Sequence, residues 1–112
     1  MQKSVNILSM SKLKQLLDIE VFSFVDSNSD WKYEEGKLEA NFQLPDFTVA
    51  MSAVSEVAEA AERMNHHPKW SNEYNKLSFS LCTHEAEDSV TSLDVDLAKE
   101  ISAIMGEAAA LM

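Results

Sequence analysis

Residues 37–65 read KLEANFQLPDFTVAMSAVSEVAEAAERMN, and the spacing of the apolar residues changes once within this stretch. Up to residue 44 apolar and polar residues alternate, which is typical of a strand with one buried face. After Pro45 the apolar residues recur at the three- and four-residue spacing of an amphipathic helix. Asp46 can cap this helix, which is predicted to extend from Phe47 to Asn65. Its predicted apolar stripe comprises Phe47, Ala50, Met51, Val54, Val57, Ala58, Ala61 and Met64.

A β-hairpin is predicted immediately before this helix. Trp31 and Tyr33 alternate with polar neighbours and lead to Glu35-Gly36, a pair suited to a two-residue turn. The alternating residues up to Leu44 then return as the second strand, with Leu38, Ala40, Phe42 and Leu44 on one face.

The start of the chain predicts a short first helix. A serine at position 9 or 11 can cap it, and Leu13, Leu16 and Leu17 fall on one side. Residues 19–24 are apolar without a clear period, and residues 26–30 have the composition of a turn.

A second hairpin and a last helix are predicted after the long helix. Pro68 disfavours helical geometry at the preceding residue, so the long helix should stop near His66. Residues 70–74 and 77–83 predict two strands around an Asn75-Lys76 turn. A polar loop leads to a helix capped by Thr91 or Ser92. Its apolar stripe comprises Leu93, Leu97, Ile101, Ile104 and Ala108.

The predicted order is therefore helix, hairpin, helix, hairpin, helix. Two hairpins can form a four-stranded antiparallel sheet, and three amphipathic helices can cover its apolar face. We expect an α+β fold with the three helices packed on one face. A chain of 112 residues is the length of one domain, so residues 1–112 should form a single unit.

Composition excludes several classes of protein. The net charge of −10 repels phosphate backbones, and the sequence has no basic stripe, so direct nucleic-acid binding is not expected. No apolar run reaches the ~20 residues that span a bilayer, and the first residues lack a signal-peptide pattern. Cys82 is the only cysteine, which favours a reducing compartment. A cytoplasmic protein is expected.

The histidines fall at predicted element ends, where functional sites are often built. His66 and His67 end the long helix, and His84 ends the strand after the second hairpin. Glu62 lies one helical turn before His66, so its charge and the helix dipole should both stabilise the imidazolium form. Asp94, in the first turn of the last helix, can orient an imidazole or hold a donor group of a ligand. A histidine held in this way can transfer protons near neutral pH.

Each of these residues also has a purely structural interpretation. A histidine at a helix end can be a simple cap, Asp94 can compensate the helix dipole, and Trp31 and Tyr74 can be packing residues. Metal binding by His66, His67, His84, Cys82 and Asp94 is disfavoured because no His-x₃-His or Cys-x₂-Cys pair sets two ligands on one face. Nucleophilic catalysis is disfavoured because no serine or cysteine lies in a recognisable nucleophile turn.

Taken as one pattern, the segment from Glu62 to Asp94 resembles the signature of the pterin-4a-carbinolamine dehydratase family. The similarity is carried by the runs NHHPKW, EYNK and THE, and by DVDLA at the start of the last helix. It is specific from about residue 31 to residue 101. Family members often have a basic residue before the aspartate, whereas this chain has Leu93, and its loop 85–88 is unusually acidic.

The resemblance implies a fold, an activity and a site. The implied fold is the four-stranded sheet with three helices already predicted from periodicity. The implied reaction removes water from 4a-hydroxytetrahydrobiopterin, giving the quinonoid dihydropterin, in the recycling of tetrahydrobiopterin for aromatic amino acid hydroxylases. No metal or other cofactor is implied. The implied catalytic residues are His66, His67 and His84, and the implied substrate-binding residues are Glu62, Asp94, Trp31 and Tyr74.

A second class of function remains open. Family members are also known in animals as a dimerisation cofactor of a homeodomain transcription factor, so a non-catalytic protein-binding module on the same fold is the alternative. A homodimer or homotetramer is expected from the resemblance and from the sheet edges that such a fold leaves open. The partners implied are the pterin substrate and, beyond it, an aromatic amino acid hydroxylase or a transcription factor.

Overall fold

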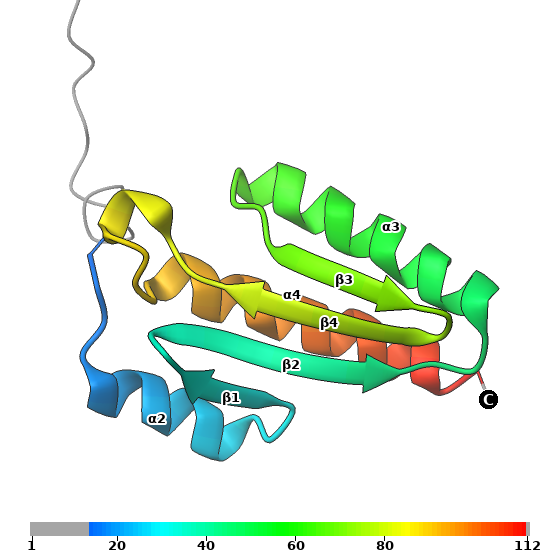
Figure 1. The fold of residues 1–112 in the computed structure, drawn as a ribbon, viewed down its shortest axis with the longest axis horizontal. Helices are drawn as coiled ribbons and strands as arrows, with labels where there is room; N and C mark the ends of the chain where they lie inside the picture. The colour runs from blue at the N-terminus through cyan, green and yellow to red at the C-terminus, as the bar shows by residue number, and fades with distance from the viewer. Residues whose placement is uncertain (1–13, 112) are drawn as a thin grey trace, which may run out of the picture.

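The computed structural model describes residues 14–111, which form three helices and one sheet (Figure 1). In chain order the elements are α2 (Asp18–Ser27), β1 (Trp31–Glu34), β2 (Lys37–Gln43), α3 (Phe47–Met64), β3 (Lys69–Glu73), β4 (Lys76–Leu81), the 3-10 helix η1 (His84–Ala86) and α4 (Ser92–Ala109). The strands form one antiparallel sheet in the order β1-β2-β4-β3. The predicted α+β order is confirmed.

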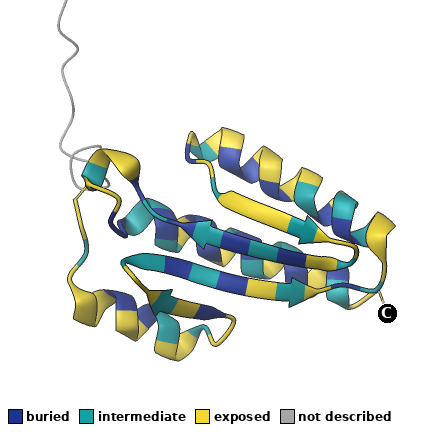
Figure 2. Cartoon of the chain, viewed as in Figure 1, coloured by how far each residue is buried: buried dark blue, intermediate teal, exposed yellow. Residues whose placement is uncertain are grey.

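Burial alternates along the central strands of the sheet, as the colours of β2 and β4 show in Figure 2, so one face of the sheet is buried. Alternate residues of β2 and β4 are buried, among them Leu38, Phe79 and Leu81. Buried residues of all three helices join these strand residues in one hydrophobic cluster, so the helices share the apolar face. Fully buried side chains such as Leu97 and Ile101 in α4 each contribute about 1.5–3 kcal/mol of burial free energy.

The long helix begins as predicted and ends one residue early. The Asp46 carboxylate accepts a hydrogen bond from the backbone N–H of Val49 at 2.8 Å, so Asp46 is the N-cap. Asn65 has the left-handed conformation, with φ of 51°. The N–H of Asn65 donates to the carbonyl of Glu62, and the N–H of His66 donates to the carbonyl of Ala61. These two bonds form a Schellman motif, which ends the helix and turns the chain.

The apolar stripe of α3 was predicted only in part. Ala50, Val57 and Ala61 are buried as expected, but the stripe also includes Ala53 and Ala60. Phe47, which was placed in the predicted stripe, is exposed. The buried residues of α3 are mainly alanines, whose small side chains allow the helix to pack closely against α4.

The first helix and the second turn differ from prediction. Residues 9–13 of the predicted first helix lie outside the described residues, and Leu16 and Leu17 precede α2, which begins at Asp18. The second hairpin turns at Tyr74-Asn75, because Glu73 pairs with Lys76. The Asn75-Lys76 prediction was thus wrong by one residue. Tyr74 adopts a left-handed φ of 55°, which its residue type does not indicate.

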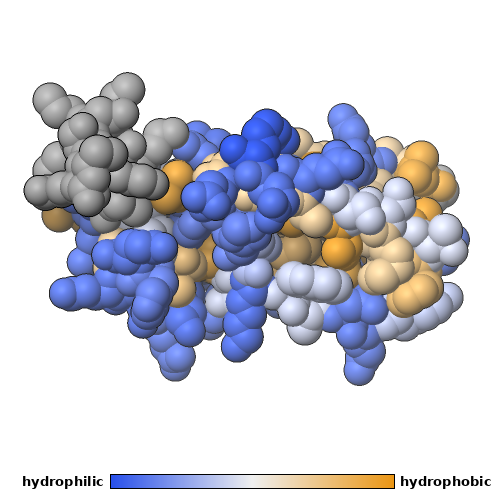
Figure 3. All heavy atoms as spheres, turned by 90° about the horizontal axis from the view of Figure 1, so that it is seen from above, coloured by the Kyte–Doolittle hydropathy of each residue, from blue (hydrophilic) through white to orange (hydrophobic). Residues whose placement is uncertain are grey.

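The end of β4 also differs from prediction. The strand ends at Leu81, and His84 begins η1 instead of ending a strand. Thr83 continues the extended chain through an isolated bridge to Ser89. Viewed as in Figure 3, the surface is mostly hydrophilic, with apolar atoms exposed between the polar side chains and at the end opposite the grey atoms. Among residues 14–111, no helix has both the length and the apolarity needed to span a membrane.

Candidate active site

The sheet register brings the segments that carry the histidines to one end of the molecule. Lys69, the first residue of β3, pairs with Ser80 near the end of β4. Residues 66–68 therefore enter the sheet beside the point where residues 82–84 leave it. Figure 1 shows the α3–β3 connection and η1 at this same end, with the start of α4 behind them.

His66 forms a buried pair with Asp94. Its Nε2 lies 2.5 Å from the Oδ1 atom of Asp94, and the two side chains are 8% and 0% exposed. The two residues are 28 positions apart and come from the end of α3 and the first turn of α4. A carboxylate buried to this degree needs hydrogen-bond donors, and His66 supplies one of them.

The other donors to Asp94 come from two threonines. Its Oδ2 atom accepts from the Thr83 hydroxyl at 2.8 Å and from the Thr91 backbone N–H at 2.9 Å. Both threonines are fully buried. Thr91 is the N-cap of α4, and Asp94 is its reciprocal partner in a capping box. Asp94 therefore serves the helix terminus and His66 at the same time.

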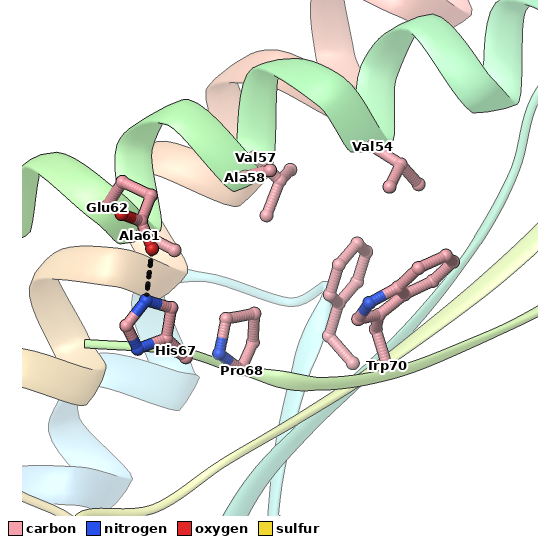
Figure 4. Close-up of a pocket in the computed structure, with 9 residues that line it drawn as sticks. Val54, Val57, Ala58, Ala61, Glu62, His67, Pro68 and Trp70 are labelled. Atoms are coloured by element: carbon pink, nitrogen blue, oxygen red, sulfur yellow. Dashed lines mark hydrogen bonds and ion pairs between the residues drawn. The ribbon is translucent and has the colours of Figure 1, made fainter. Parts of the chain in front are cut away.

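His67 faces a cavity between α3 and the sheet (Figure 4). Its Nε2 lies 2.6 Å from the Oε1 atom of Glu62, and both side chains are largely exposed. The cavity has a volume of about 230 Å³ and a mainly apolar lining. Its lining residues are Val54, Val57, Ala58, Ala61, Glu62, His67, Pro68, Trp70 and Phe79. It can receive a small flat molecule against aromatic walls, with polar groups at one end.

His84 lies on the surface beside an acidic residue. Its Nδ1 lies 2.9 Å from the Oδ1 atom of Asp88, and its side chain is 90% exposed. The hydrogen bond to Asp88 raises the pKa of His84, and the charge of that carboxylate raises it further. A larger fraction of His84 is therefore protonated near neutral pH than for an ordinary histidine.

The predicted pairing of Glu62 with His66 was wrong. The prediction assumed that the helix continues to His66, which would place the two residues on one face. The left-handed Asn65 ends the helical path first, so Glu62 pairs with His67 and His66 turns inward to Asp94.

Two of the predicted substrate-binding residues lie away from the cavity. Trp31 is 1% exposed and its indole N–H donates to the Ser102 hydroxyl at 2.8 Å, so it is a core residue in this structure. Tyr74 is 65% exposed in the β3–β4 turn, at the opposite end of that hairpin from the histidines. His66, His84 and Asp94 do not line the cavity either.

Some residues at this end of the molecule were missed by sequence reasoning. Thr83 precedes His84 directly, and a buried threonine next to a histidine carries no sequence signal of its own. Asp88 follows His84 by four residues, a spacing that could have indicated the pair had the loop been recognised as a helical turn. Trp70 and Phe79 are aromatic residues paired across β3 and β4. The predicted Asn75-Lys76 turn would have paired Trp70 with Leu81 instead, so this aromatic pair did not follow from the predicted hairpin.

Comparison with known proteins gives a consistent result. The family model for pterin 4 alpha carbinolamine dehydratase matches residues 9–104. A Synechococcus protein provisionally named pterin-4-alpha-carbinolamine dehydratase is 45% identical over 74 residues, covering 66% of this chain and 78% of its own. A Rhizorhabdus wittichii protein with the same provisional name is 35% identical over 94 residues, covering 82% of this chain and 96% of its own.

A solved structure shares the fold. The Brucella melitensis protein described as a transcriptional coactivator/pterin dehydratase matches with a TM-score of 0.79 and 30% sequence identity. The match covers 83% of this chain and all of that chain.

Proposed function

Because this chain belongs to the pterin-4a-carbinolamine dehydratase family, we propose that it converts a 4a-hydroxytetrahydropterin to the quinonoid dihydropterin and water. The provisionally named relatives support a dehydratase activity at the level of the family. The physiological substrate on this proposal is 4a-hydroxytetrahydrobiopterin, formed by aromatic amino acid hydroxylases, and the role is tetrahydrobiopterin recycling in the cytoplasm.

The reaction is a proton transfer at two sites of one ring system. The 4a hydroxyl is a poor leaving group and must gain a proton to depart as water. The N5–H bond gives up its proton while its electrons form the C4a–N5 double bond. The substrate and product differ only by water, so no electron is supplied or removed. Well-placed acid and base groups contribute about 10²–10⁴-fold to such a step.

We assign the proton donor to His84 and the proton acceptor to His66. Neither side chain lines the cavity, so this assignment requires the reacting C4a–N5 edge of the pterin to extend out of the cavity toward the end of the molecule where both histidines lie. Asp88 raises the pKa of His84, so a larger fraction of His84 is protonated near neutral pH and able to donate to the 4a hydroxyl. His66 is held through Nε2 by a buried carboxylate, which leaves Nδ1 to accept the N5 proton. As in a hydrolytic triad, a buried aspartate fixes the ring and stabilises the imidazolium, although here it holds Nε2 and not Nδ1.

His67 and the cavity provide the binding surface on this proposal. The Trp70 and Phe79 rings and the Pro68 ring offer flat apolar contacts to a bicyclic pterin. Glu62 and His67 stand at one end of the cavity, where they can hydrogen bond to the polar edge of the ring. Glu62 is a natural acceptor for the amino and ring N–H groups of a pterin.

The observation that carries the proposal is the pair of adjacent histidines, each held by its own carboxylate. One of them, His67, also faces an aromatic cavity. The test is ultraviolet absorbance of enzymatically generated 4a-hydroxytetrahydropterin, with and without the protein. We expect faster conversion with the protein, and loss of the acceleration in the His66→Ala, His84→Ala double variant.

Two further variants make this result interpretable. His84→Ala alone changes an exposed residue, so it separates a catalytic loss from a folding defect. Ser52→Ala, an exposed position on a face of α3 that does not line the cavity, is the control and should keep the full rate. An unchanged rate in the double variant would remove the roles assigned to His66 and His84.

A protein-binding role is the second candidate. It is supported by the Brucella melitensis structure, whose description names a transcriptional coactivator alongside the dehydratase. On this reading the chain assembles as a homodimer or homotetramer and bridges a protein partner such as a transcription factor or a hydroxylase. The exposed edge strand β3 is available for such contacts. Light scattering measures the assembly state, and a stable complex without turnover would favour this role over catalysis.

A further inference from the structure

A connected set of hydrogen bonds surrounds Asp94, and the directions of these bonds can be worked out. The Thr83 hydroxyl lies 2.8 Å from Asp94 Oδ2 and 2.7 Å from the Thr91 hydroxyl. The Thr91 hydroxyl accepts from the backbone N–H of Leu93 at 3.2 Å. Thr83, Thr91 and Asp94 have no exposed surface.

Only one assignment of protons satisfies these contacts with an ionised Asp94. A carboxylate can only accept, and a hydroxyl has a single proton to donate. Thr83 must therefore donate to Asp94, and Thr91 must donate to Thr83. The Thr91 hydroxyl can do so because Leu93 fills its acceptor role. Asp94 Oδ2 then receives two donors, from the Thr83 hydroxyl and from the Thr91 N–H.

This assignment determines which ring nitrogen of a neutral His66 carries the proton. Oδ1, the second oxygen of Asp94, faces Nε2 of His66 and requires a donor. In the neutral imidazole only one ring nitrogen carries a proton, so that proton lies on Nε2 and Nδ1 is the free acceptor. Within residues 14–111, no fully buried side-chain nitrogen or oxygen lacks a hydrogen-bond partner. In the same part of the chain, no group forms a hydrogen bond with the Nδ1 atom of His66.

We propose that Thr83 is a positioning residue, whose buried hydroxyl holds Asp94 so that His66 keeps its proton on Nε2 and presents Nδ1 for proton transfer. The catalytic consequence rests on the proposed dehydratase function. The position of the proton is a property of the free protein and does not depend on that function.

Thr83 also joins the two histidines that we assign as base and acid. Its side chain contacts the carboxylate that holds His66, and its backbone leads directly into His84. The backbone N–H of Thr83 donates to the carbonyl of Ser89 at 2.8 Å, and its carbonyl accepts from Ala86 at 3.1 Å. One residue therefore fixes the orientation of His66 and anchors the turn that carries His84.

The test is ¹⁵N NMR of the histidine side chains at a pH where His66 is neutral. In the wild-type protein we expect a protonated Nε2 and an unprotonated Nδ1 for His66. Thr83→Val keeps the shape of the side chain and removes its donor, so it should move the ring-nitrogen shifts of His66 toward a mixture of tautomers. Thr83→Ser restores the hydroxyl and should restore the wild-type spectrum.

The absorbance assay gives the second readout. We expect Thr83→Val to lower kcat about tenfold with little change in KM, and Thr83→Ser to recover most of the rate. A His66 proton on Nδ1 in the wild type would overturn the proposal even if Thr83→Val does not fold. Unchanged ring-nitrogen shifts in a folded Thr83→Val protein would overturn it as well.

Failure of the dehydratase assignment gives a different result. A wild-type protein without dehydratase activity would refute the proposed reaction. The same protein with His66 protonated on Nε2, and with that preference lost in Thr83→Val, would still support the positioning role.

Discussion

Replacing Asp94 with asparagine preserves the shape of the side chain but removes its charge and one acceptor oxygen. Three donors converge on the two carboxylate oxygens: His66 Nε2, the Thr83 hydroxyl and the Thr91 N–H. An amide can satisfy the two donors on one side with its oxygen, but its NH₂ group then faces His66. His66 must become an acceptor at Nε2 and move its proton to Nδ1, the atom proposed to accept the substrate proton.

The stability loss follows from these contacts. Losing the charge-assisted bond to the buried carboxylate costs about 1.5–3 kcal/mol. Losing a negative charge in the first turn of α4 costs about 0.3–1 kcal/mol more. The sum is roughly 2–4 kcal/mol, which for a domain of this length lowers Tm by about 8–16 °C, at ~4 °C per kcal/mol.

Thermal unfolding followed by circular dichroism measures this loss, with Asp96→Asn as the matched control. Asp96 lies two residues further along α4 and is exposed, so the same change there should leave Tm nearly constant. The absorbance assay, run well below Tm, should show a fall of about 10²–10⁴-fold in kcat for Asp94→Asn only. Equal Tm values for the two variants, within about 2 °C, would refute the reasoning about the buried carboxylate.

Three other substitutions test separate parts of the site. Asp88→Asn should lower the pKa of His84, which Asp88 raises, so NMR titration should show protonation lost at lower pH. The alkaline fall in dehydratase rate should shift the same way, because the protonated form is the donor. Ala58→Trp should fill the cavity and raise KM by about tenfold or more, whereas Ser52→Trp, at an exposed position on another face of α3, should not. Trp31→Phe should lower the free energy of unfolding by about 1–3 kcal/mol, measured by chemical denaturation, and leave KM unchanged. A raised KM would show that Trp31 does contribute to substrate binding.

Much of the fold could be predicted because local chemistry and tertiary packing agree. Asp46 is a strong N-cap, and Glu35-Gly36 adopts the two positive φ values that a tight hairpin turn requires. α2 was not predicted at its actual position because it lacks the two usual signals of a helix, a polar N-cap residue and a wide apolar stripe. Its N-cap is Leu17, whose backbone N–H is satisfied by the side chain of Glu20, and its buried face is narrow.

For the candidate site, the sequence indicated which residues to consider but not how they are arranged in space. Histidines at element ends were recognised, but the partner of His66 is a residue 28 positions away, and no local pattern encodes such a contact. The predicted partner, Glu62, was chosen by helical spacing, and one left-handed residue was enough to break that spacing. The proposed role of Thr83 depends on its complete burial, which is set by tertiary contacts that the sequence does not show.

The left-handed Asn65 has a consequence for how this chain can vary in length. Because of this residue, the side chain of His66 lies in the interior and that of its neighbour His67 faces solvent. Deleting one residue before His66 would move His67 into the interior position, and inserting one there would move His66 to the exposed position. In each case one of the two carboxylates would lose its imidazole partner. Insertions should be accommodated far better in the Tyr74-Asn75 turn, which lies at the other end of the hairpin.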